Sequence, residues 1–227
     1  MRQNVSLFLC PVVDLDEGLL AALLAELTLQ ERQRARRFSC NQAYHLFVVA
    51  HAALHWALRD AGVHRYDLAC NPQGKPYLRD HPDLHFNLSH TEGLIAVALC
   101  AGRPIGVDVE RLADLQTYQE LAARVMTPAE CSYMAAQSTP QDRFTQLWSA
   151  KEALMKATGL GFALPPREIE FSGPAPTLCR LPPEHGLPGD WRVCCQRLPG
   201  HWLALASRVE DLTLEPTTLT PLDLLSS

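Results

Sequence analysis

The chain has 227 residues, 47% of them hydrophobic and 20% charged, which is enough apolar material to bury one large core or two smaller ones. The formal net charge of −5 argues against a general nucleic-acid binder, whose affinity comes chiefly from Lys and Arg side chains that neutralise phosphates. The longest uncharged apolar stretch, Gly93–Gly102, is about half of the roughly 20 residues that a membrane-spanning helix needs. We therefore expect a globular cytoplasmic protein that binds neither nucleic acid nor membrane.

The first half of the chain alternates between strand and helix patterns. We expect a strand over Val5–Val13, a helix over Asp16–Leu27, and a short arginine-rich helix that begins at Thr28 with capping-box spacing. Apolar residues at helical spacing then predict a long helix over Asn41–Leu58, with its inner stripe in the core. The short helix after Thr28 carries an arginine cluster, which consists of Arg32, Arg34, Arg36 and Arg37. Such a cluster is typical either of a solvated helix face or of an anion site, and both interpretations stay open at this point.

Turn and strand signals continue up to the midpoint of the chain. Pro and Gly place a loop over Asn71–Pro76, and Leu84–Leu88 alternates like a strand that enters a turn. The runs Leu94–Cys100 and Ile105–Glu110 flank a turn with Gly and Pro, so we expect them to pair as an antiparallel hairpin.

The second half combines two helices with further strands. Thr127 is followed by a proline and, three residues on, by a glutamate, which predicts a capped helix start. A second helix is expected over Gln141–Thr158, where glycines follow. Trp191–Leu198 and His201–Arg208 have the pattern of strands joined by a Pro-Gly turn, so each half holds strands on either side of helices.

Two acidic residues share one face of the predicted strand over Ile105–Glu110. Because strand side chains alternate, Asp108 and Glu110 point the same way, roughly 6 to 7 Å apart, and a divalent cation fits between them. Taken alone, this pattern is more typical of the exposed face of an edge strand.

Two further segments carry polar groups. On the helix over Gln141–Thr158, Ser149, Glu152 and Lys156 share a face, although Glu152 and Lys156 alone would form an ordinary helix-surface ion pair. Phe86–Thr91 places hydroxyl, imidazole and amide groups at the exit of an apolar strand. A lone histidine in such a place is more often structural.

Considered together and in order, four segments resemble the 4′-phosphopantetheinyl transferase superfamily, in its Sfp-type branch. These segments are Gly74–Pro76, Phe86–Thr91, Ile105–Glu110 and Trp148–Lys156. Trp148 followed by Lys151-Glu152-Ala153 matches the W/KEA subgroup, which points loosely to polyketide or nonribosomal peptide biosynthesis.

The resemblance implies an α/β (α+β) fold built as a pseudo-twofold pair of similar α/β halves. The halves would be residues 1–103, which contact the coenzyme A nucleotide, and residues 104–227, which carry the metal and catalytic residues. The active site would lie in the cleft between them, and the protein would act as a monomer.

The resemblance also implies a magnesium-dependent reaction. Asp108, Glu110 and Glu152 would bind Mg²⁺, which would also grip the pyrophosphate of coenzyme A. A serine of an acyl or peptidyl carrier protein would attack the β-phosphate and release 3′,5′-ADP. The expected catalytic residues are Glu152 as the base, Lys156 as the group that stabilises charge, and Asp108.

The same resemblance assigns residues to the binding of coenzyme A. Lys75, Ser89, His90 and Lys151 correspond to family positions that contact it, and Arg34 from the arginine cluster is carried over as a 3′-phosphate partner.

The chain departs from the family in its long N-terminal helix. Relatives often have arginine where this chain offers His45, Leu46 and His55. The departure implies weaker binding of coenzyme A, or greater dependence on Arg34 and Lys75.

Two alternative functions are related to this motif pattern, and one segment is expected to bind the carrier protein. A holo-acyl-carrier-protein synthase uses similar motifs but is typically much shorter and trimeric, and a non-catalytic carrier-binding module would not need the acidic residues. We expect the carrier protein to dock on Leu112–Met134, with Arg124 and Met126 as contacts.

Overall fold

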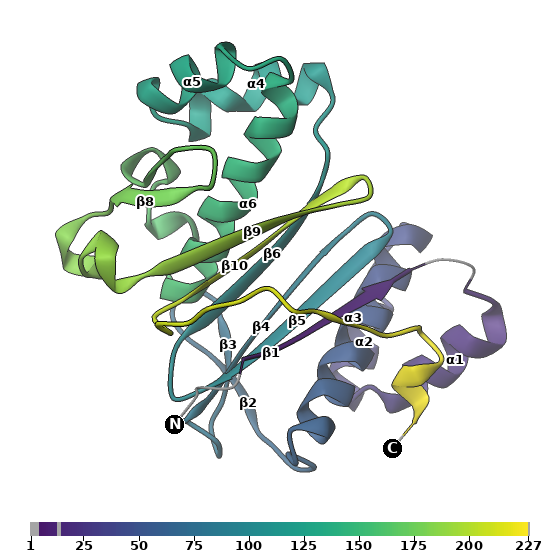
Figure 1. Ribbon diagram of the computed structural model, residues 1–227. Helices are drawn as coiled ribbons and strands as arrows, with labels where there is room; N and C mark the ends of the chain where they lie inside the picture. The colour runs from purple at the N-terminus through teal and green to yellow at the C-terminus, as the bar shows by residue number, and fades with distance from the viewer. Residues whose placement is uncertain (1–4, 13–14, 227) are drawn as a thin grey trace.

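The computed structural model describes residues 5–12 and 15–226, and Val13, the last residue of the predicted first strand, lies outside the described residues (Figure 1). The first half holds one strand, then helices, then strands, as the sequence predicts, and it adds two short strands, Leu68–Cys70 and Pro76–Leu78, which the sequence did not indicate. The elements of this half are β1 (Val5–Pro11), α1 (Glu17–Glu26), α2 (Leu29–Ala35), α3 (Asn41–Asp60), β2 (Leu68–Cys70), β3 (Pro76–Leu78), β4 (Leu84–Thr91) and β5 (Leu94–Ala101).

The second half holds both predicted helices and both predicted strands, together with a further helix over Leu115–Val125 and short elements that the sequence did not indicate. Its helices are α4 (Leu115–Val125), α5 (Pro128–Ala135) and α6 (Pro140–Thr158). Its strands are β6 (Ile105–Arg111), β7 (Glu170–Ser172), β8 (Thr177–Arg180), β9 (Arg192–Leu198), β10 (His201–Ser207) and β11 (Thr217–Thr218). Short 3₁₀ helices lie at Gly161–Ala163, Pro166–Glu168, Pro183–His185, Pro188–Asp190 and Asp223–Leu225.

Local chemistry explains where the best-predicted helices begin. The Thr28 side chain accepts from the backbone N–H of Glu31, and the Glu31 carboxylate accepts in return from the backbone N–H of Thr28. Thr127 and Glu130 form the same reciprocal pair at the start of α5. Each box satisfies two N–H groups that a helix start otherwise leaves unpaired, so both predicted starts are confirmed.

The predicted hairpin between β5 and β6 is wrong. β5 pairs on one side with β1 and on the other with β4, so neither of its edges is left for β6. β6 pairs with β10 instead, in a second sheet of order β6-β10-β9 beside the first sheet of order β11-β1-β5-β4. The turn between β5 and β6 therefore connects two sheets.

The two halves share one connectivity. In the first, β1, α3, β4 and β5 follow in sequence and the strands lie in the order β1-β5-β4; in the second, β6, α6, β9 and β10 follow, with the order β6-β10-β9. Neighbouring strands are antiparallel in both sets. The fold is thus of mixed α and β type with two similarly wound halves, and an exact pseudo-twofold relation stays a prediction.

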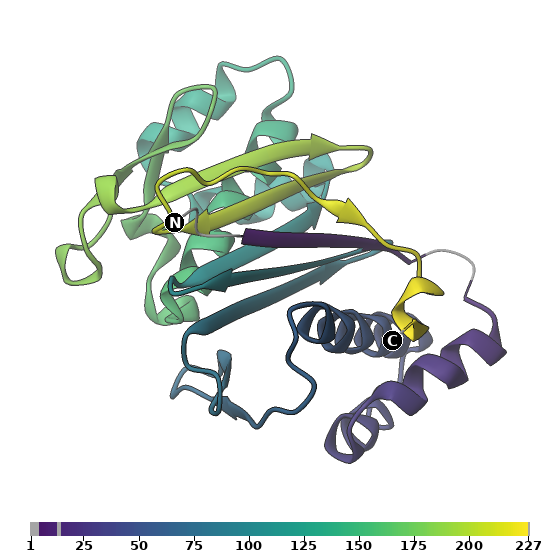
Figure 2. The same cartoon turned by 60° about the horizontal axis from the view of Figure 1, so that its bottom comes forward.

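Three clusters of buried side chains define the layers. α1, α2 and α3 pack on one face of the first sheet, and α6 packs on one face of the second. The remaining faces meet each other, and their contact is made by residues such as Leu7, Ala96, Val107 and Leu203. The order of layers is therefore helices, sheet, sheet, helices, and Figure 2 shows α1 and α3 to one side of the strands.

The C-terminal tail returns to the first half. β11 pairs in parallel with β1, and Leu219 and Leu224 are buried among the side chains of α1 and α3. Figure 2 shows this segment crossing from β10 toward α1. The division of the chain at residue 103 stays a prediction, and the tail packs with the residues before that point. No helix among the described residues combines the length and the apolar character that crossing a membrane requires.

Candidate functional site

Three carboxylates converge where β6 meets α6. Asp108 and Glu110 project from one face of β6, as the alternation of the strand predicts, and Glu152 projects from α6. Each contributes one carboxylate oxygen, and these oxygens lie within 4.8 Å of one another. The predicted convergence is confirmed, and the separation suits a single ion bound by all three groups.

Gly106 allows the helix to come this close to the strand. A Cβ atom at this position would lie 2.0 Å from the carbonyl oxygen of Ala153 and 2.4 Å from the backbone nitrogen of Ala157. Both atoms belong to the backbone of α6, so the helix would have to move to make room. Gly106 stands two residues before Asp108 on the same strand face, and its missing side chain therefore brings Glu152 within reach of Asp108.

Asp108 is the most buried of the three acids, at 1% exposed. Its Oδ1 atom accepts from the Ser89 hydroxyl at 2.9 Å and from Lys156 Nζ at 2.5 Å. Its Oδ2 atom is buried and accepts no hydrogen bond from any described residue. A buried carboxylate oxygen without a donor is costly, and a cation at this point would remove that cost.

Lys156 provides the positive charge of the site. Its Nζ atom donates to Ser89 Oγ at 2.9 Å and lies 3.6 Å from Glu152 Oε2 as well as beside Asp108. Burial alone would lower the pKa of Lys156, but the charges of Asp108 and then Glu152 outweigh it and raise the pKa above its usual value. The amine is therefore protonated and holds Ser89 in the site.

Side chains of β4 join the two sheets beside this cluster. The Asn87 side-chain oxygen accepts from the backbone N–H of Val107 at 2.8 Å, and Ser89 Oγ accepts from that of Val109 at 3.3 Å. The open edge of β6 is thus satisfied by side chains instead of by a neighbouring strand. The sequence placed the amide of Asn87 in a polar segment but gave it no role, because only the packing of β4 beside β6 reveals its partner.

Burial and mutual repulsion change the acidity of two of the carboxyls. Burial, followed by the charges of Asp108 and Glu152, raises the pKa of Glu110 from 4.5 to about 8. Burial, followed by the charge of Asp108, raises the pKa of Glu152 from 4.5 to about 7. Without a cation, these groups hold protons near neutral pH.

The raised pKa values predict a specific dependence of stability on pH. A carboxyl with a higher pKa in the folded chain stabilises the fold fully below its unfolded pKa, and this contribution is lost as pH rises through the folded values of about 7 and about 8. We therefore expect Tm without divalent cations to fall as pH rises from about 5 to about 8. Because metal ligands must be deprotonated, the rise in Tm on adding Mg²⁺ should grow over the same range.

Thermal unfolding at several pH values, with and without Mg²⁺, checks this expectation. An increase in Tm on adding Mg²⁺ that is the same at the lowest and the highest pH would contradict it, because proton release would then play no part in binding.

The residues assigned to the nucleotide lie on the first half. The Arg34 guanidinium lies 5.5 Å from the centre of the Phe47 ring, so α2 presents it over α3. Burial lowers the pKa of His51 to about 4, and the charges of Arg34 and His90 act in the same direction. The contact of Arg34 and His90 with coenzyme A stays a prediction.

Lys75 has a structural function that the sequence did not indicate. Its Nζ atom donates to the carbonyl oxygens of Ile105 at 3.0 Å and Ala157 at 3.2 Å, which ties the loop between β2 and β3 to β6 and α6. Burial lowers the pKa of Lys75 to about 8. Two of its three donors are thus engaged, and its contact with coenzyme A stays a prediction.

Two sequence-based assignments are wrong. Lys151 was expected to contact coenzyme A, but its side chain is 0% exposed and donates to Glu130 and to three carbonyl oxygens inside the protein. Met126, expected to contact a carrier protein, is 1% exposed, whereas Arg124 is exposed. Both errors have the same cause, because the place of a residue along the chain does not reveal which side of an element faces the interior.

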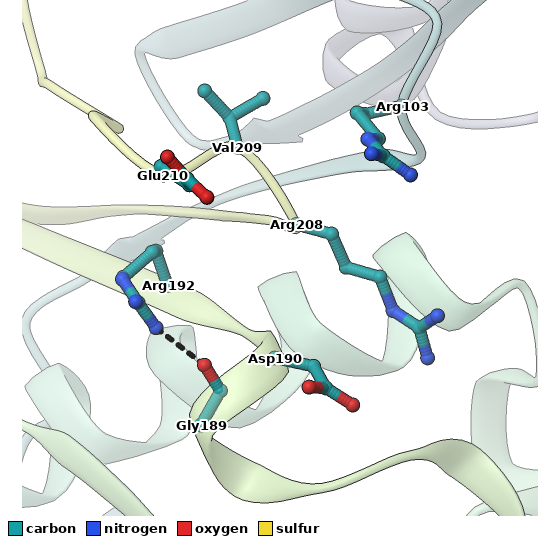
Figure 3. A pocket seen from close by; sticks show the side chains of 7 residues that line it. All are labelled: Arg103, Gly189, Asp190, Arg192, Arg208, Val209 and Glu210. Carbon is teal, nitrogen blue, oxygen red and sulfur yellow. Dashed lines mark hydrogen bonds between the residues drawn. The ribbon is translucent and has the colours of Figure 1, made fainter.

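A cavity of about 420 Å³ has none of the three converging acids among its lining residues, which Figure 3 shows. It is lined by three arginines and two carboxylates, together with Gly189 and Val209. The Arg192 guanidinium donates to the Gly189 carbonyl oxygen at 2.6 Å, so part of its positive end is already engaged. None of the residues predicted for metal, catalysis or coenzyme A lines this cavity.

Comparison with known proteins identifies the family. A family model described as the 4′-phosphopantetheinyl transferase superfamily matches residues 104–206, the segment that carries all three acids. The 4′-phosphopantetheinyl transferase HetI of Nostoc sp. is 33% identical over 72% of this chain and 72% of its own length.

Two Bacillus subtilis proteins are also similar. One, named 4′-phosphopantetheinyl transferase, is 32% identical over 63% of this chain; the other, 4′-phosphopantetheinyl transferase Sfp, is 30% identical over 60% of it. The matches span 65% and 62% of those two relatives, slightly less than two thirds. The match to the Nostoc protein is more extensive, and with the family model across the acidic segment it places this chain in the 4′-phosphopantetheinyl transferase superfamily.

Proposed function

We propose that this chain transfers the 4′-phosphopantetheine arm of coenzyme A to a serine of an acyl or peptidyl carrier protein and releases 3′,5′-ADP. The observation that carries the proposal is the convergence of Asp108, Glu110 and Glu152 in a chain of this superfamily. Three relatives carry the name of that activity. The Sfp-type W/KEA assignment and a monomeric state rest on the motif resemblance, and a cytoplasmic location stays the expectation drawn from the composition of the chain.

The carboxylate ligands at the site fit a magnesium ion. Carboxylate oxygens are the hard ligands that Mg²⁺ prefers, and this ion usually leaves further positions to water and to substrate phosphates. The buried Oδ2 of Asp108 supports a cation here because it has no donor among the described residues. Asp108, Glu110 and Glu152 would hold the ion, which when bound would offset negative charge on the diphosphate.

Glu152 is the residue that we assign as the base. A serine hydroxyl is a weak nucleophile at neutral pH, so a positioned group has to take its proton. In the proposed step, a bond forms between the serine oxygen and the β-phosphorus. The bond from that phosphorus to the bridging oxygen breaks, and its electron pair leaves with 3′,5′-ADP. The serine proton passes to Glu152, directly or through a water.

Lys156 and Ser89 complete the proposed chemistry on the protein side. The protonated amine of Lys156 lies against Asp108 and Ser89, where it would stabilise charge on the diphosphate as the bond breaks. Arg34 and His90 would receive the 3′-phosphate end of coenzyme A, with Lys75 and Ser89 as further contacts. A cationic side chain that binds this end would act on affinity more than on the chemical step.

Transfer to apo carrier proteins tests the proposal. The chain is incubated with coenzyme A, Mg²⁺ and a panel of apo acyl and peptidyl carriers, and each carrier is weighed by mass spectrometry. We expect at least one carrier to gain the mass of the phosphopantetheine arm, and we expect EDTA to abolish the gain. No gain on any carrier would overturn the proposal, and binding without transfer would favour a non-catalytic carrier-binding module.

Replacing Arg34 by glutamine should weaken the use of coenzyme A. We expect KM for coenzyme A to rise about tenfold, equivalent to about 1.4 kcal/mol, with kcat nearly unchanged, because the guanidinium contacts a non-reacting part of the substrate. Steady-state kinetics check this, with Arg37→Gln as the control from the same exposed cluster. Equal KM values for Arg34→Gln and the wild type would remove Arg34 from the binding site.

A further inference from the structure

Lys151 and Glu130 form an ion pair inside the second half of the fold. Lys151 Nζ lies 2.6 Å from Glu130 Oε2, and the two side chains are 0% and 1% exposed. The amine also donates to the carbonyl oxygens of Val125 at 3.0 Å, Pro166 at 2.9 Å and Ile169 at 2.9 Å. A single side chain of α6 is therefore bonded to the end of α4, to α5 and to both ends of the segment that leads into β7.

Glu130 is bonded just as fully. Its Oε2 atom accepts from the backbone N–H of Thr127 at 2.8 Å, which belongs to the capping box of α5. Its Oε1 atom accepts from the backbone N–H of Phe171 at 2.9 Å, at β7. Most of these partners are backbone groups of several different elements. The pair therefore fixes the orientation of α6 relative to those elements as well as its distance from them.

The position of this pair in α6 connects it with the acidic cluster. Lys151 directly precedes Glu152, and consecutive residues of an α-helix differ by about 100° around its axis, so fixing one fixes the direction of the next. On the facing side, Gly106 brings the backbone of α6 against β6. A rotation or shift of α6 that moved Glu152 away from Asp108 would also break the bonds of Lys151.

We propose that the buried Lys151–Glu130 pair is a positioning device that holds Glu152 within bonding distance of the ion shared with Asp108 and Glu110. The inference rests on the proposed function for its kinetic part, but the positions of the ligands are a property of the protein alone. A protein in which well-packed apolar residues replace a buried ion pair is often no less stable than the original. Directional bonds, in contrast, select one rotation of the helix, which a metal site of three convergent ligands requires.

The double variant Lys151→Met with Glu130→Gln tests the proposal, because it removes both charges together and leaves neither one buried alone. Binding of Mn²⁺ to the protein without substrate, measured by electron paramagnetic resonance, is the first readout. We expect at least about tenfold weaker Mn²⁺ binding, the usual size for loss of a group that orients metal ligands. The second readout is the steady-state kinetics of phosphopantetheine transfer. We expect the double variant to have a lower kcat and a KM for coenzyme A near the wild-type value.

Asp142→Asn is the matched control, because Asp142 forms a 2.9 Å ion pair with Arg197 and also belongs to α6, but near its start and at a partly exposed site. It should bind Mn²⁺ like the wild type.

A folded double variant with wild-type Mn²⁺ affinity and kcat would overturn the proposal. Should the double variant fail to fold, Lys151→Met alone decides by the same readouts, because Glu130 keeps the backbone N–H groups of Thr127 and Phe171 as partners and a carboxyl can become neutral by taking up a proton. Absence of transfer by the wild type would overturn the proposed function instead. The Mn²⁺ affinities of the wild type and the double variant would still test whether the Lys151–Glu130 pair positions the metal ligands.

Discussion

Glutamine at position 152 is expected to lower the rate of phosphopantetheine transfer by about 10²- to 10⁴-fold, the range usual for loss of a positioned general acid or base. The change keeps the size of the side chain and removes both its negative charge and its ability to take a proton. It also removes one of the three carboxylates that converge at the site. Single-turnover transfer to an apo carrier, followed by mass spectrometry, measures the loss.

Two further measurements separate the functions of Glu152. Raising the Mg²⁺ concentration would restore part of the rate if the loss comes from metal binding, but not if it comes from the missing base. Glu168→Gln, at an exposed position beyond the end of α6, is the matched control and should retain the full rate. A Glu152→Gln variant within a few-fold of the wild-type rate would remove Glu152 as the base and would leave the carboxylate convergence unexplained.

Alanine at position 106 is expected to damage the fold and the site together. The added methyl group would lie 2.0 Å from the Ala153 carbonyl oxygen and 2.4 Å from the Ala157 nitrogen, and backbone atoms cannot turn aside as side chains can. Overpacking of a core typically costs about 1–3 kcal/mol, occasionally more, and we expect this contact to fall at or above the upper end. Urea unfolding with and without Mg²⁺ measures the change.

The same substitution should also affect metal binding. Moving α6 away from β6 separates Glu152 from Asp108, so Mg²⁺ should raise the free energy of unfolding of Gly106→Ala less than that of the wild type. Gly189→Ala is the control, because a Cβ atom at that position meets no atom within 4 Å. If Gly106→Ala unfolds at the wild-type urea concentration and keeps its full response to Mg²⁺, then close packing at Gly106 does not hold the site together.

Local rules account for the parts of the protein that the sequence predicted well. The starts of α2 and α5 follow from capping boxes, in which each helix start supplies its own missing partners. The common direction of Asp108 and Glu110 follows from the alternation of side chains along one strand. The order of four short motifs was sufficient to indicate the family, to which the relatives and the family model assign the chain.

Predictions that needed long-range information were less successful. The hairpin between β5 and β6 was inferred from a good turn, but β5 has both edges occupied by β1 and β4. The sequence could not show that competition, because β1 lies far from β5 along the chain. Lys151 was assigned by its place in a motif, whereas the burial of its amine depends on α4, α5 and the segment before β7.

The sequence by itself determined the types and approximate limits of most of the longer helices and strands, with α4 as the exception, and it determined which acidic residues share a face. These properties depend on neighbours within a few positions along the chain. Tertiary structure alone decided that Glu152 meets Asp108 and Glu110, that Asn87 joins the two sheets, and that Lys151 points into the protein. The first two depend on how closely α6 approaches β6 and how β4 lies beside it, and the third depends on how α4, α5 and the segment before β7 pack on α6. All of them are set by packing between segments far apart in sequence.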